Sequence, residues 1–240
     1  MKAEIEKADT ISITIDIDWA HDKVLENCVS ILDEYKVNVT FFCTHKHNVH
    51  IGNNHELAIH PNYNCNESYE ETIRKLMKLF PKAKGIRSHG LHVDYKLYPI
   101  YKKYGLEYES NYFMYKQANI KPFKMSNDIL QIPIFFMDDS HIGRSINANY
   151  KLDQFNLKNK GRKVFVFHPI HIFLNTNNLK IYLDAKKYYH EPEKLKDFYN
   201  EGEGTCSLFI RLLDYIKLNS MKLYTMDEVN NIWRSTTSDS

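Results

Sequence analysis

The chain has 240 residues, of which 43% are hydrophobic and 13% aromatic, enough apolar material for a sizeable core. Its 32 basic and 30 acidic side chains are interspersed and leave a formal charge of only +2, so nothing points to a nucleic-acid partner. No stretch approaches the roughly 18 consecutive apolar residues of a membrane-spanning helix, and residues 1–10 lack the apolar core of a secretory signal. We therefore expect one globular domain over residues 1–240, a cytoplasmic location and no integral membrane segment.

The first elements predict a β-α-β unit. Residues 11–18 alternate isoleucine with polar residues, which is typical of a strand with one apolar face. Residues 22–35 place apolar side chains at helical spacing, and Asp22 is a candidate N-cap. Residues 37–43 are β-branched and aromatic and predict a second strand.

Strands and helices continue to alternate along the rest of the chain. We expect strands at 56–60, 85–87, 130–137, 163–168 and 222–224, and helices at 68–80, 95–104, 205–218 and from Thr225, a candidate cap. No GxGxxG or GxxxxGK[ST] turn is present, so a parallel α/β sheet or barrel is favoured over a nucleotide-binding doubly wound fold. Catalytic groups of a barrel lie at the carboxyl ends of strands, where this prediction places Asp16, Asp18, His60, Arg87 and His168.

Asp16 and Asp18 are the first candidate site residues. They stand two apart on a strand, so their side chains project from the same face. Two carboxylates so placed repel each other unless a cation or a guanidinium lies between them. A solvated strand end is the alternative, but the flanking isoleucines and Trp19 favour a metal site.

Ten of the twelve histidines fall between residues 45 and 171. His60 ends a predicted strand immediately before Pro61, which suits a metal ligand, whereas His55 projects from the opposite face. His168 follows a run of apolar residues and precedes Pro169, and His171 is a competing candidate at the same place. Arg87 precedes a polar turn, where it can pair with a buried carboxylate or form an ordinary surface ion pair.

Together these residues resemble the motif set of the polysaccharide deacetylases, the NodB-homology domains of carbohydrate esterase family 4, over residues 11–172. The matching segments are Thr-Ile-Asp-Ile-Asp at 14–18, Val-Asn-Val-Thr-Phe-Phe at 37–42 and His-Glu-Leu-Ala-Ile-His at 55–60. Arg87 and His168 match the family's arginine and late histidine. Residues 16–20 and 60–64 are most similar to the WbmS-type branch, which is linked to surface-polysaccharide synthesis.

The resemblance implies a distorted or incomplete (β/α) barrel that removes an N-acetyl group from a sugar with a divalent metal ion. Zinc is the first expectation, with manganese, cobalt or iron as alternatives. Asp18, His60 and Asn64 would be the metal ligands, Asp16 the general base oriented by Arg87, and His168 the acid that protonates the leaving amine. We expect the sugar to contact Trp19, His89, Asp139 and His171.

The sequence also departs from the family pattern. Asn64 stands where a second histidine ligand is usual, Ile17 separates the two aspartates, and Ser88-His89 replaces a proline. The tryptophan motif is reduced to Phe135, Phe136 and the pair Asp138-Asp139. The expected substrate is a nucleotide- or lipid-linked glycan precursor carrying an N-acetylated sugar. Two alternatives stay open: a catalytically altered member that binds glycans, and a hydrolase of another non-peptide C–N bond.

Overall fold

The computed structural model describes residues 10–144 and 149–237. The N-terminal residues 1–9, which enter the expectation of a cytoplasmic location, lie outside the described residues. Nine described strands form one sheet in the order β6-β7-β5-β4-β3-β2-β1-β9-β8, and every pairing in it is parallel except β6 with β7. The strands are β1 (Ile11–Asp16), β2 (Thr40–Cys43), β3 (Glu56–Ile59), β4 (Gly85–Ile86), β5 (Tyr108–Glu109), β6 (Phe123–Lys124), β7 (Leu130–Gln131), β8 (Phe136–Met137) and β9 (Lys163–Phe167). This curled half-barrel confirms the predicted fold class.

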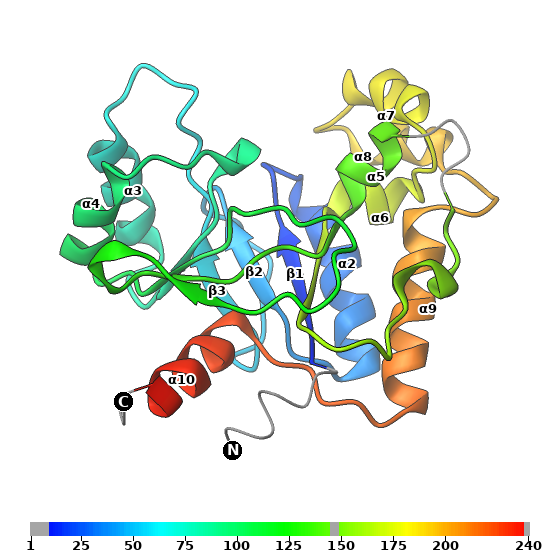
Figure 1. Ribbon diagram of the computed structural model, residues 1–240. Coiled ribbons are helices and arrows are strands. Elements are labelled where there is room, and N and C mark those ends of the chain that lie inside the picture. Colours follow the sequence, from blue (N-terminus) through cyan, green and yellow to red (C-terminus); the bar gives the residue numbers. More distant parts are fainter. Residues whose placement is uncertain (1–9, 145–148, 238–240) are drawn as a thin grey trace.

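Helices surround the sheet (Figure 1). They are α2 (Asp22–Tyr35), α3 (Tyr69–Leu79), α4 (Leu97–Lys103), α5 (Asp138–Arg144), α6 (Pro169–Leu174), α7 (Leu179–Lys186), α8 (Pro192–Leu195), α9 (Thr205–Leu218) and α10 (Met226–Thr237), with 3-10 turns η1 (His89–Leu91), η2 (Ser126–Asp128), η3 (Leu152–Phe155) and η4 (Lys196–Phe198). In Figure 1, α5 to α8 gather at the upper right, beyond the carboxyl end of β1, while α3 and α4 lie on the left. Within the described residues, no helix combines the length and the apolar character needed to cross a bilayer.

Strand β1 is buried on both faces, as is usual for a central strand of a parallel sheet. Ile11, Ile13 and Ile15 belong to the largest core cluster, which also contains residues of α2 and α9. The opposite face is polar and lies inside the half-barrel. There the Thr14 hydroxyl donates to the Phe165 carbonyl oxygen at 3.1 Å, so burial leaves this group satisfied.

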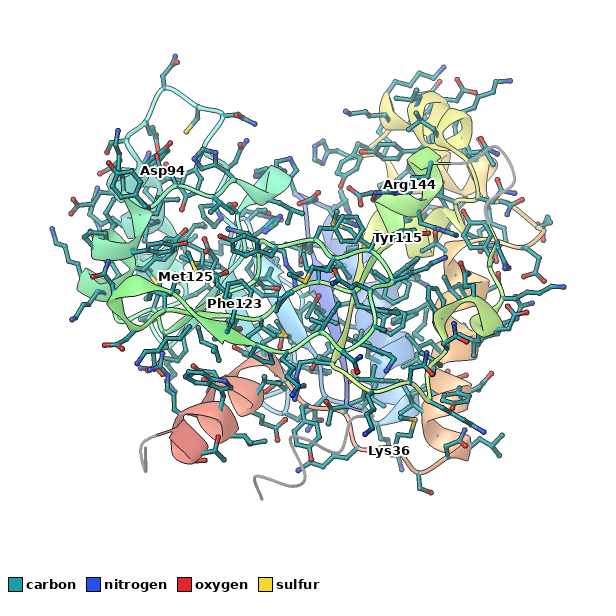
Figure 2. The ribbon with its side chains drawn as sticks, viewed as in Figure 1. Lys36, Asp94, Tyr115, Phe123, Met125 and Arg144 are labelled. Atoms are coloured by element: carbon teal, nitrogen blue, oxygen red, sulfur yellow. The ribbon has the colours of Figure 1, made fainter. Side chains whose placement is uncertain are left out.

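Helix α2 has the predicted bounds but a different N-cap. His21 caps it, since its Nδ1 accepts from the Lys23 amide at 3.1 Å, and the prediction of Asp22 as the cap is wrong. The Asp22 carboxylate instead accepts from the Asn48 side-chain amide at 2.9 Å. The helix ends at Lys36, which has a left-handed backbone (φ 54°) and lies at the bottom of Figure 2, away from the carboxyl end of β1.

The predicted strand at 130–137 is wrong as a single element. It divides into β7, which pairs with β5, and β8, which pairs with β9, so the chain crosses from one side of the half-barrel to the other. Pro133 lies at the crossing and has no amide hydrogen to continue a ladder. The Met114 amide donates to the Ile134 carbonyl oxygen at 2.8 Å and the Lys116 amide to that of Phe135 at 2.9 Å, contacts that curl the sheet.

The C-terminal helix α10 docks on the amino ends of two strands. Thr225 caps it as predicted: its hydroxyl accepts from the Glu228 amide at 3.2 Å. The Met226 amide donates to Thr40 Oγ1 at 2.8 Å, and the Asp227 amide donates to Glu56 Oε2 at 2.9 Å. The predicted strand at 222–224 reduces to an isolated bridge between Leu223 and Ile11.

Glu56 is expected to make stability pH-dependent. Its carboxylate accepts from Thr40 Oγ1 and from the Tyr108 hydroxyl, and burial raises its pKa from 4.5 to about 7 despite these bonds. The pKa of Glu56 is higher in the folded than in the unfolded protein. The stability that protonated Glu56 contributes is therefore complete below pH 4.5 and is lost as pH rises through about 7. In Glu56→Gln, the fall in stability across this window, about 3 kcal/mol, should disappear.

Urea unfolding of Glu56→Gln at several pH values, beside the exposed control Glu26→Gln, measures this difference. Stability curves for Glu56→Gln and the unmodified protein that stay parallel between pH 4.5 and 7 would contradict the prediction.

Candidate active site

Four parallel strands bring ionisable side chains to one edge of the sheet. Asp16 ends β1, His60 follows β3, Arg87 follows β4 and His168 follows β9. The strands are paired in parallel, so their carboxyl ends meet at the same edge. With Asp18, two residues beyond Asp16, these side chains form one connected set of contacts.

Arg87 is fully buried and fixes the floor of this site. Its Nη1 donates to Asp16 Oδ1 at 2.6 Å and to Thr14 Oγ1 at 2.8 Å. Its Nε donates to the Ser110 carbonyl oxygen at 3.0 Å and its Nη2 to Ser110 Oγ at 2.9 Å, while the guanidinium lies 4.1 Å over the Phe42 ring. The buried charge is paired and hydrogen-bonded on every nitrogen, which is what makes such burial tolerable.

Asp18 is the centre of the cluster. Its Oδ1 lies 3.1 Å from His60 Nε2 and 3.2 Å from His89 Nδ1, and its Oδ2 lies 3.5 Å from His168 Nε2. The second oxygen of Asp16 is 3.9 Å from His60 Nε2. Burial alone would raise the pKa of Asp18, but the neighbouring imidazoles of His60 and His89 hold it well below its usual range. The hydrogen bond to Asp18 in turn raises the pKa of His89.

His168 is held by Asp138. Its Nδ1 lies 2.6 Å from Asp138 Oδ1, and its backbone amide donates to Asp138 Oδ2 at 2.8 Å. Burial would lower the pKa of His168, but the Asp138 carboxylate raises it well above its usual value. The imidazole is therefore oriented, with Nε2 turned toward Asp18, and the carboxylate favours its protonated form.

The helix that carries Asp138 is held by hydrogen bonds and a cation–π contact. His141 of α5 lies with Nδ1 3.0 Å from the Tyr115 hydroxyl and Nε2 2.9 Å from the Asn149 carbonyl oxygen. Arg144 lies 4.5 Å over the Tyr115 ring, and Figure 2 shows the two side chains together. Asp138 is the first residue of α5 and directly follows β8, so no loop separates it from the sheet.

The other predicted site residues are distributed around this cluster. Trp19 is 36% exposed and meets the His89 ring edge-on at 5.1 Å. His171 is buried behind His168, against Tyr182, and burial lowers its pKa to about 4.

Two predicted residues are exposed. Asp139 lies beside Asp138 and His168, within a group of side chains close enough to share an ion. Asn64 lies in the loop after β3, where its backbone amide donates to Asn62 Oδ1 at 2.9 Å. Among the described histidines, cysteines and acids, the ligand group around Asp18 consists of that residue, His60 and His89.

Sequence reasoning did not give Asp138 a role, nor did it foresee that His89 meets Asp18. The adjacent acids at 138 and 139 were the available signal, but the sequence does not show which of them turns inward. The positions of Thr14 and Ser110 around Arg87 depend on strand pairing, which no local pattern reveals.

A curled parallel half-barrel with this ionisable cluster at its carboxyl edge is the architecture of the polysaccharide deacetylases. Residues 13–186 match the family model of the WbmS-like polysaccharide deacetylases, and the chain belongs to that family. It is similar to the crystal structure of WbmS from Bordetella bronchiseptica, a polysaccharide deacetylase described as involved in O-antigen biosynthesis. The two share 26% sequence identity over 87% of this chain and 91% of that one, with a TM-score of 0.80.

Two further solved structures are more distant from this chain. A polysaccharide deacetylase structure from Mycobacterium smegmatis has 14% identity over 92% of this chain and 94% of that one, with a TM-score of 0.47. A family 4 pseudoenzyme from Bacillus anthracis has 12% identity over 94% and 66% of the two chains, with a TM-score of 0.48. No protein of curated function matches the chain.

Proposed function

We propose that this protein is a metal-dependent hydrolase that removes an N-acetyl group from a sugar of a surface-polysaccharide precursor. The observation that carries the proposal is the placement of one Asp18 oxygen between two imidazole nitrogens, His60 Nε2 at 3.1 Å and His89 Nδ1 at 3.2 Å.

The donor atoms of this group fit a divalent cation. The Arg87 carbonyl oxygen lies 2.6 Å from His60 Nδ1 and accepts its hydrogen. In the neutral ring, His60 Nε2 then carries a lone pair directed at the Asp18 carboxylate, a contact that a cation between them makes favourable. The same bond to the Arg87 carbonyl fixes the ring orientation, as is usual around metal-bound histidines.

Two imidazoles and one carboxylate form a ligand set known from catalytic zinc sites, in which a further position is open to water or substrate. We therefore propose zinc, with manganese, cobalt or iron as alternatives that accept the same nitrogen and oxygen donors. In this proposal His89 is the third metal ligand, a role that the resemblance to the family assigned to Asn64. When bound, the cation supplies a Lewis acid that polarises the acetamide carbonyl and acidifies water.

Asp16 is the proposed general base. Arg87 occupies its Oδ1, which leaves Oδ2, directed toward His60, as the oxygen that accepts a proton from water. The buried guanidinium holds that carboxylate in one orientation.

His168 is the proposed general acid. Its Nε2 faces the cluster, and Asp138 both orients the ring and favours its protonated form. It is therefore placed to give a proton to the departing amine of the sugar.

The substrate proposed is an N-acetylated sugar of a nucleotide- or lipid-linked precursor, processed in the cytoplasm. Membership of the WbmS-like family and the O-antigen role described for the Bordetella protein support a precursor of surface polysaccharide. Trp19, exposed beside His89, offers an aromatic face on which a sugar can stack.

Metal analysis of the purified protein, followed by acetate release from nucleotide-linked and lipid-linked N-acetylhexosamines, tests this proposal. We expect about one equivalent of metal per chain and acetate release that a chelator abolishes and added zinc or cobalt restores. Absence of both bound metal and acetate release would favour the alternative of a glycan-binding module. Activity confined to long chitin-like polymers would contradict the precursor substrate.

A further inference from the structure

The turn that follows β1 has an unusual backbone. Asp18 and Trp19 both have positive φ angles, 37° and 55°, and the Ala20 amide donates to the Ile17 carbonyl oxygen at 2.8 Å across them. Two consecutive left-handed residues are ordinarily glycine or asparagine, and a bulky tryptophan there is an outlier. Such a conformation persists only where surrounding contacts hold it.

Two hydrogen bonds from distant parts of the chain hold this turn. The Trp19 amide donates to Thr44 Oγ1 at 3.1 Å, at the end of β2. The Tyr189 hydroxyl donates to the Asp18 carbonyl oxygen at 2.7 Å. Tyr189 lies between α7 and α8, 171 positions away from Asp18 in the sequence and beyond residues 13–186 that match the family model.

We propose that Tyr189 is a positioning residue for the metal site. Its hydroxyl fixes the peptide between Asp18 and Trp19, and this peptide sets the direction of the Asp18 carboxylate toward His60 and His89. The inference rests on the proposed function, since it assigns a role in holding the metal ligand that this function requires. It also gives the α7 to α8 segment a part in the site.

The contacts of Tyr189 distinguish it from its neighbours. It packs with Tyr182 and Tyr188 on a cluster that contains Ala20 and residues of α2, α6, α7 and α8, so its ring has a structural role that phenylalanine would preserve. Its hydroxyl, however, reaches the backbone of a residue in the site. Tyr188 packs on the same cluster, where its ring lies 5.8 Å from that of Phe198, and it serves as a matched control.

The test compares Tyr189→Phe with Tyr188→Phe. We expect Tyr189→Phe to weaken cobalt and zinc affinity about 10-fold or more, the range seen when the hydrogen-bonding support of a metal ligand is lost. The melting temperature of its metal-free form should stay within about 2 °C of the unmodified protein, whereas Tyr188→Phe should change neither quantity. Equal metal affinity in Tyr189→Phe and the unmodified protein would overturn the inference. So would an equal loss of affinity in Tyr188→Phe.

Glycine provides a rescue. Trp19→Gly accepts a positive φ without strain, so adding Tyr189→Phe to it should cost clearly less metal affinity than the same change in the unmodified protein. An undiminished loss in the double variant would contradict positioning through the turn.

A readout without metal separates this inference from the proposed function. Trp19 and Trp233 are the only tryptophans, so in a Trp233→Phe background the fluorescence of Trp19 reports on the turn. Removing the Tyr189 hydroxyl should raise the fraction of molecules in which the turn leaves this conformation about fivefold, the effect of one lost hydrogen bond. Acrylamide should then quench the fluorescence of Trp19 more strongly. If the unmodified protein binds no metal, the proposed function fails. Unchanged quenching would then overturn the role of Tyr189 as well.

Discussion

Asp18→Asn is expected to abolish metal binding at micromolar metal, and the deacetylase activity with it. The asparagine amide is neutral and a weaker metal ligand than the carboxylate oxygen, which lies 3.1 Å from His60 Nε2 and 3.2 Å from His89 Nδ1. Asp16→Asn should instead keep the metal and lose about 10²- to 10⁴-fold in turnover, the usual contribution of a general base.

Metal content by atomic spectroscopy and initial rates of acetate release, measured on both variants, separate the two roles. Arg87 keeps a hydrogen-bond acceptor in Asp16→Asn, so a matched melting curve serves as the control for folding. Equal metal content and equal activity in the two variants would overturn the assignment.

His89→Ala is expected to weaken zinc affinity by more than about 100-fold, beyond the loss that follows from removing an outer-shell partner. His89 Nδ1 is the second imidazole nitrogen near the Asp18 oxygen, and nothing else in the described ligand group replaces it. Asn64→Ala should leave the affinity within about twofold, because this residue is exposed in the loop after β3.

Competition of a zinc-binding dye against both variants measures these affinities. The reverse result, a large loss of zinc affinity in Asn64→Ala and none in His89→Ala, would show that Asn64 and not His89 is the third ligand. Asn64→His adds a further check: tighter zinc binding would show that the loop can close over the site.

Much of the fold follows from local patterns. The alternating isoleucines of β1 and the helical spacing of α2 predict their elements directly, because both patterns record which face is buried. The segment around Pro133 could not be predicted in this way. Its apolar residues suit a strand throughout, and only the pairing of β7 with β5 and of β8 with β9 reveals the crossing.

The sequence likewise predicts one part of the candidate site and not the other. The clustering of Asp16, His60, Arg87 and His168 follows from parallel strands ending at one edge, which the alternation of strands and helices already implies. The contact between His89 and Asp18 depends on the path of η1, and the choice of Asp138 over Asp139 depends on where β8 passes into α5. Such features are set by tertiary packing, which spacing along the chain does not encode.

The contacts of Arg87 bear on how this protein can change over evolutionary time. The same guanidinium that orients Asp16 also links Thr14 of β1 to Ser110, the residue that follows β5. A substitution of Arg87 should therefore impair both the proposed reaction and folding, so few substitutions are expected to be tolerated at this position. The side chain of Trp19, in contrast, is exposed beside His89 and holds no strands together. New substrate preferences are therefore expected to arise through substitutions of exposed residues such as Trp19, while Arg87 and its hydrogen-bond partners stay unchanged.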